Sequence, residues 1–231
     1  MMKNNFLTPI LLILMMLNSC APKGSKIIAI DVLLTVPEDV YQHAIALNQS
    51  ILKDNPDNFQ LDDHHIPHIT LLQAYVLESD MVNIEKTLES LYKTIEKDTL
   101  WASHLQYNKD KPSSFASIGI EEKNEPLQAL HKEVIARLKP YILSDGNQEA
   151  YVQNPDGSPI DDFTIAYVPK FVSHYSYENF NPHISLGVAQ THVLDSLNAH
   201  VFRGMKFRAT SISVYQLGNF GTAQKLLWES K

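Results

Sequence analysis

Residues 67–71 read PHITL and residues 182–186 read PHISL, although the sequence around these two segments does not repeat. Both segments alternate apolar and polar positions, which is typical of a strand with one face in the core. In such a strand His68 and Thr70 point to one face, and the residues between and after them point to the other. Each segment is therefore expected to present one imidazole beside one hydroxyl.

The second segment supplies His183 and Ser185 in the same relation. Two imidazoles that face a common cleft suit phosphodiester chemistry, because one can take a proton from the attacking oxygen while the other protonates the departing oxygen. Histidine titrates near neutral pH, so both protonation states are available. The hydroxyls of Thr70 and Ser185 would donate hydrogen bonds to the non-bridging phosphate oxygens, where negative charge builds up.

The rest of the chain alternates strand and helix patterns in two similar sets, each containing one copy of the motif. This pattern predicts an α+β domain of two lobes spanning residues 26–231. A polar stretch at 144–163 predicts an inserted flap. The expected strands are 26–36, 65–77, 100–107, 115–121, 163–172, 182–189 and a final pair around the GNFG turn; the expected helices begin at Pro37 and Ser79 or span 125–142 and 192–202.

The N-terminus predicts export. Lys3 precedes an apolar stretch at 6–17 that is too short to span a bilayer comfortably, as in a secretory signal peptide. The letters LNSC at 17–20 resemble a bacterial lipobox, which implies cleavage before Cys20 and lipid attachment to it. We therefore expect a lipoprotein signal peptide at 1–19, a tether at 20–25 and a lipid-anchored protein of the cell envelope facing the periplasm or exterior. An ordinary signal peptide cut elsewhere or an uncleaved anchor are the alternatives.

Charge and cysteine content limit the partners. The net charge is −7 and Lys and Arg are scattered, so a long nucleic acid is a poor fit, whereas a small phosphorylated ligand is compatible. Cys20 is the only cysteine, so no internal disulfide can form. We expect a monomer.

The paired motifs resemble those of the 2H phosphoesterases, also called the LigT-like or 2′-5′ RNA ligase-like superfamily. HITL at 68–71 and HISL at 183–186 match its two His-x-Thr/Ser-x motifs. The resemblance implies two pseudo-symmetric antiparallel sheets with helices outside and a central cleft. It implies His68 and His183 as the catalytic pair and a reaction that needs no cofactor or metal: opening of a 2′,3′-cyclic nucleotide or cleavage of a 2′-5′ linkage.

Other readings stay open. The cleft could bind a nucleotide without turnover, the protein could have RNA 2′-5′ ligase-like activity, or it could be an envelope interaction protein without a phosphate ligand. Tyr175, Tyr177 and Phe180 precede the second motif and could either stack on a nucleobase or pack in the core.

A cluster of acidic and histidine side chains lies just before the first motif, at Asp62, Asp63, His64, His65 and His68. Its spacing matches no common zinc signature. A solvated loop is the preferred interpretation.

Overall fold

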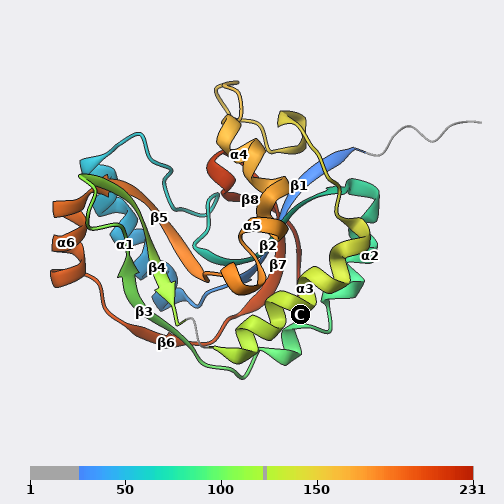
Figure 1. Ribbon diagram of the computed structural model, residues 1–231, viewed down its shortest axis with the longest axis horizontal. Helices are drawn as coiled ribbons and strands as arrows, with labels where there is room; N and C mark the ends of the chain where they lie inside the picture. The colour runs from blue at the N-terminus through green and yellow to red at the C-terminus, as the bar shows by residue number, and fades with distance from the viewer. Residues whose placement is uncertain (1–25, 122–123, 231) are drawn as a thin grey trace, which may run out of the picture.

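Two four-stranded antiparallel sheets form the centre of the molecule, as the computed structural model shows for residues 26–121 and 124–230 (Figure 1). The strand orders are β2-β1-β7-β8 in the first sheet and β5-β4-β3-β6 in the second. The strands are β1 (Ile27–Thr35), β2 (His68–Leu77), β3 (Leu100–Gln106), β4 (Ser113–Ile120), β5 (His183–Gln190), β6 (Met205–Phe207), β7 (Ser211–Leu217) and β8 (Ala223–Glu229). Both copies of the motif lie in strands, as predicted, although β2 begins at His68 and not at residue 65.

Helices flank both sheets (Figure 1). They are α1 (Glu38–Asp54), α2 (Met81–Leu88), α3 (Glu125–Leu138), α4 (Asp162–Tyr167), α5 (Phe171–His174) and α6 (Thr191–His200). The apolar stripe of α1 is fully or almost fully buried, at Val40, Ala44, Leu47 and Ile51. The helix therefore forms where periodic apolar side chains can leave water together.

The helices are exchanged between the two sheets. Helix α1 follows β1 of the first sheet but packs against β5 of the second, beside α6. Helix α3 follows β4 of the second sheet but packs against β2 of the first, beside α2. The order β1-α1-β2 thus corresponds to β4-α3-β5, and the two halves are related by an approximate two-fold. The α+β, two-lobed prediction is confirmed, but the lobes are not successive halves of the chain, because β7 and β8 return to the first sheet.

One predicted strand is wrong. Residues 163–172 form α4, a short 3-10 turn and the start of α5 instead of a strand. Asp161 caps this segment by accepting a hydrogen bond from the Thr164 amide at 3.3 Å. A short apolar run has no periodicity that separates a strand from a helix, so capping decides the structure here.

The predicted signal peptide, the tether and Cys20 lie outside the described residues. Within the described ranges, no helix is long and apolar enough to cross a membrane. No group of three or more His, Cys, Asp or Glu side chains in the same ranges is placed to hold a metal ion.

Candidate active site

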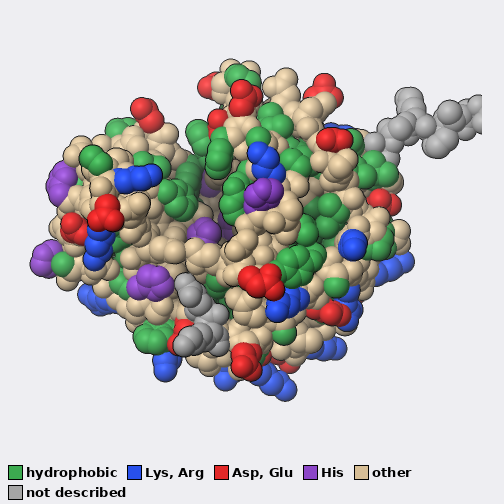
Figure 2. Space-filling view, viewed as in Figure 1, with side chains coloured by type: hydrophobic (Ala, Val, Ile, Leu, Met, Phe, Trp, Pro, Cys, Tyr) green, Lys and Arg blue, Asp and Glu red, His purple; other side chains and the backbone are tan. Residues whose placement is uncertain are grey.

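The two motifs open into one cavity. Strands β2 and β5 are edge strands of their sheets and contact each other, so the two sheets meet along the motif strands. A cavity of about 500 Å³ lies there, lined by His68, Thr70, His183 and Ser185 among others. Figure 2 shows this hollow between the two halves, with histidine side chains visible inside it. The volume is in the range of small-molecule sites, about 300–1,000 Å³.

Both imidazoles are held in the same way by their own chain. His68 Nδ1 lies 2.7 Å from the Ile66 carbonyl oxygen, and His183 Nδ1 lies 2.7 Å from the Asn181 carbonyl oxygen. A carbonyl can only accept, so each Nδ1 must carry the hydrogen. Each Nε2 is therefore left to accept or release a proton, as an acid/base catalyst requires.

The surroundings of the two rings differ. Burial alone lowers the pKa of His68, but the nearby Asp31 carboxylate, 3.5 Å from Nε2, outweighs it and raises the pKa above its ordinary value. Burial lowers the pKa of His183, the Asn181 carbonyl partly offsets this, and the positive charge of His68 lowers it further. The arrangement therefore favours the protonated form of His68 and the neutral form of His183.

The two motif hydroxyls also differ. Thr70 Oγ1 donates to Asp31 Oδ2 at 2.8 Å. The Ser185 side chain makes no hydrogen bond with any described residue and lines the cavity, so its hydroxyl is free to donate to a ligand. Thr70 would have to turn its hydrogen away from Asp31 to do the same.

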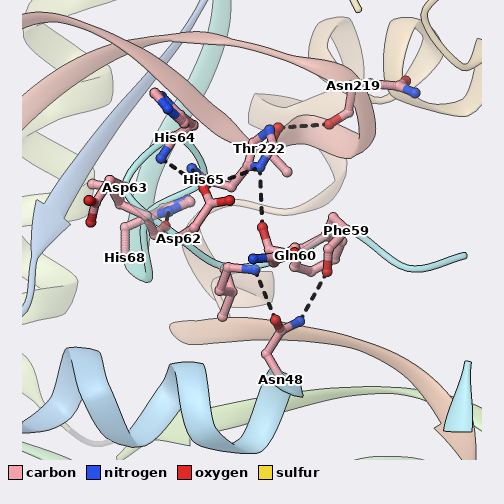
Figure 3. A network of polar contacts seen from close by, with 12 residues as sticks. Asn48, Phe59, Gln60, Asp62, Asp63, His64, His65, His68, Asn219 and Thr222 are labelled. Atoms are coloured by element: carbon pink, nitrogen blue, oxygen red, sulfur yellow. Dashed lines mark hydrogen bonds and ion pairs between the residues drawn. The ribbon is translucent and has the colours of Figure 1, made fainter. Parts of the chain in front are cut away.

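A buried polar side chain from the opposite helix supports each motif strand. Asn48 on α1 donates to the Leu186 carbonyl at 2.9 Å and to the Phe59 carbonyl at 3.0 Å, and accepts from the Leu61 amide at 2.9 Å. Its side chain is fully buried. Asn48 thus joins α1, the second motif strand and the loop before the first motif, and Figure 3 shows its bonds to this loop.

His131 on α3 is the counterpart of Asn48. Its Nδ1 donates to the Leu71 carbonyl at 2.8 Å, and its Nε2 accepts from the Tyr177 amide at 3.0 Å. The ring stacks on Phe180 with centroids 3.8 Å apart. Burial lowers the His131 pKa to about 4, although the Leu71 carbonyl partly opposes this. The ring is therefore neutral at pH 7, as its accepting Nε2 requires.

The acidic and histidine cluster before the first motif is a turn. Asp62 Oδ1 accepts hydrogen bonds from the amides of His64 and His65 at 2.8 and 3.0 Å (Figure 3). The Nδ1 atom of His65 also lies 3.7 Å from Asp62 Oδ1. The carboxylate thus closes the turn by an Asx-type interaction.

The three aromatic residues suggested for stacking have different positions. Tyr175 lines the cavity and stacks on Tyr167 with centroids 4.4 Å apart. Phe180 is buried against His131, which is a packing role, although it borders the cavity. Tyr177 is not among the lining residues and supports His131 through its backbone.

Several residues of the site were not anticipated from the sequence. The rim is formed by exposed Phe163 (70%) and Phe220 (56%), with Phe115 beside His183. Asp31 was also missed, although a lone acid within the apolar run IIAIDVLL is a signal that could have found it, because buried charges need partners.

This architecture and the facing histidine motifs define a fold of the 2H phosphoesterase type. The chain belongs to the 2′-5′ RNA ligase superfamily, whose family pattern matches residues 49–219. Similar solved structures include E. coli LigT complexed with phosphate (12% identity, TM-score 0.40, covering 90% of this chain and 99% of that one) and Kluyveromyces marxianus Usb1 (14% identity, TM-score 0.37, 89% and 99%). No curated protein gave a significant match.

Proposed function

We propose that this protein is a phosphodiesterase that opens a cyclic phosphodiester of the nucleoside 2′,3′-cyclic phosphate type or cleaves a 2′-5′ linkage. The observation that carries the proposal is the pair of imidazoles in one cavity, His68 and His183, each with its Nδ1 hydrogen fixed on a backbone carbonyl. Each Nε2 is thereby available for proton transfer.

In the proposed reaction, the neutral imidazole takes a proton from water as the water oxygen attacks phosphorus. The protonated imidazole gives its proton to the oxygen that departs from the opposite side. The new P–O bond forms as the old one breaks. One imidazole has then gained a proton and the other has lost one, so the total number of protons on the pair is unchanged. The Ser185 hydroxyl would donate to a non-bridging oxygen, where charge increases in the transition state.

The lining of the cavity favours a singly charged ligand with an aromatic or apolar body. None of the described lining residues is Lys or Arg. Tyr167, Tyr175 and Phe163 provide ring faces suited to a nucleobase. A phosphodiester carries one negative charge, whereas a phosphomonoester approaches two, so this surface supports a diester substrate.

The test is a screen of the purified protein against 2′,3′-cyclic nucleotides and 2′-5′ dinucleotides, followed by His68→Ala and His183→Ala. Each variant should lose roughly 100-fold or more in turnover, as is typical of general acid/base catalysis. His174→Ala is the matched control, because His174 belongs to a third His-x-Ser sequence, is exposed and is not among the residues that line the cavity. Equal activity of the wild type and the double variant would refute the proposal.

Two outcomes would favour the alternatives. A protein whose melting temperature rises with nucleotides but which turns none over would be a binding protein, because a ligand of the native state alone raises stability. Joining of RNA ends through a 2′-5′ linkage would show the ligase-like reaction.

A further inference from the structure

The first motif strand has a defined register against β1. His68 lies opposite Thr35, and Asp31, four residues earlier on β1, lies opposite Gln73. The register shifts between these pairs, so that Leu71 has no partner on β1. This bulge turns the strand and brings the side chain at the Asp31 position beside the imidazole.

The second motif strand repeats this register against β4. His183 lies opposite Gly119, and Phe115, four residues earlier on β4, lies opposite Val188. The shift again leaves the last residue of the motif, Leu186, without a partner. Asp31 and Phe115 therefore occupy the same position in the two halves. Each contacts the imidazole of its own half, but one is a carboxylate and the other a hydrocarbon ring.

We propose that this one strand position sets the direction of proton transfer: Asp31 is a positioning residue that keeps His68 as the proton donor, and Phe115 leaves His183 as the acceptor. The proposal deepens, and for its catalytic meaning rests on, the proposed phosphodiesterase function. Asp31 is fully buried and is not among the lining residues, so it acts through His68 and not on the substrate.

The hydrogen bonds of Asp31 hold it in place for this task. Its Oδ2 accepts from Thr70 Oγ1 at 2.8 Å and from Gln73 Nε2 at 2.9 Å, and lies 3.5 Å from His68 Nε2. Its Oδ1 is buried and has no hydrogen-bond partner among the described residues. A buried charge with an unpaired oxygen is costly, and a protonated His68 offsets that cost through its opposite charge.

Phe115 gives His183 no comparable support. The two rings meet edge to face, with centroids 6.4 Å apart and planes at 83°. A phenyl ring supplies no anion and removes water from the imidazole, so it favours the neutral form. The opposite pKa directions of His68 and His183 agree with this difference.

The other titratable groups around His68 and His183 do not reverse this difference in pKa. Tyr167 lies near Asp31, but burial, together with Tyr175 and Asp31, raises its pKa to about 12, so it is neutral at pH 7. His65 also lines the cavity and is paired with Asp62. No Lys or Arg is among the described lining residues.

The first experiment does not depend on activity. NMR titration of the histidine ring protons gives separate pKa values for His68 and His183 in the full-length protein. In Asp31→Asn, the pKa of His68 should fall from above its ordinary value of 6.5 to below it, because burial remains while the charge is lost. In Phe115→Asp, at a position that is 46% exposed, the pKa of His183 should rise.

Phe115→Leu is the matched control, which removes the ring without adding charge and should not raise the His183 pKa. An unchanged His68 pKa in Asp31→Asn would overturn the proposal. Should Asp31→Asn fail to fold, the titration of Phe115→Asp tests the proposal instead. An unchanged His183 pKa in that variant would then overturn the proposal.

The second experiment compares leaving groups. A 2′,3′-cyclic nucleotide releases an alkoxide that needs a proton, whereas bis(p-nitrophenyl) phosphate releases a stable phenolate that does not. At pH 8, Asp31→Asn should lose up to roughly 100-fold on the cyclic nucleotide and little on the nitrophenyl ester. His183→Ala should lose activity on both. Equal losses of Asp31→Asn on both substrates would show a merely structural role.

Failure of the two ideas can be told apart. If neither diester is turned over, the proposed function fails, and the NMR titration still decides whether Asp31 controls His68. If both diesters are turned over but it is His183→Ala that loses activity only on the cyclic nucleotide, the phosphodiesterase function stands. The assignment of His68 as the proton donor is then overturned.

Discussion

Replacing His131 by Phe should destabilise the protein in a pH-dependent way. The substitution keeps an aromatic ring against Phe180 but leaves the Leu71 carbonyl and the Tyr177 amide without their partner. Each buried unsatisfied group costs about 1–3 kcal/mol, so the free energy of unfolding at pH 7.5 should fall by about 2–6 kcal/mol.

The pH dependence follows from the lowered pKa of His131. Between its ordinary pKa of 6.5 and its folded value of about 4, the unfolded chain binds a proton that the folded chain does not. The stabilisation is complete above pH 6.5 and is lost as the pH falls toward 4, by about 3 kcal/mol in all. The variant lacks this titration, so its deficit relative to the wild type should shrink by about that amount between pH 7.5 and 4.

Urea unfolding followed by fluorescence of the two tryptophans would measure both quantities. Asn48→Leu is the matched control, because Asn48 holds the other motif strand in the equivalent way but does not titrate. Its deficit should be several kcal/mol and should not vary with pH. A deficit of His131→Phe that stays constant over this range would refute the argument.

Three further predictions concern function and attachment. The kcat/KM for a diester should rise with pH through the pKa of His183, below 6.5, and fall through that of His68, above 6.5; a monotonic profile would contradict paired acid/base catalysis. Tyr175→Ala should raise KM by about 5- to 150-fold, from a stacking free energy of about 1–3 kcal/mol, while a substrate without a base should be unaffected. Cys20→Ala should release the protein from membranes in a fractionation assay, and continued membrane association would count against lipid attachment.

The sequence predicted the parts of the fold that depend on local patterns. Strand alternation placed both motifs correctly, and the 3.6-residue period of α1 and α3 matched their buried faces. The exchange of these helices between the sheets could not be predicted, because an apolar stripe does not specify which sheet it covers. The helix at 162–167 was missed since its capping by Asp161 outweighs the β-branched composition around it.

The sequence predicted the part of the site that the two matching motifs supply. His68 and His183 could be paired because their motifs are alike, and the structure places both in one cavity. Their difference was not foreseen, because it comes from Asp31 and Phe115, which stand in sequences that share no pattern. Only the register of the strands reveals that these two positions correspond.

The exchange of α1 and α3 restricts how the cleft can move. A hinge rotation that widened the cleft would have to pull α1 from β5 and α3 from β2, breaking the buried bonds of Asn48 and His131. Such a motion would amount to partial unfolding. Ligand access should therefore depend on small local displacements at the rim, where Phe163 and Phe220 are exposed, while the distance between the two imidazoles stays fixed through the catalytic cycle.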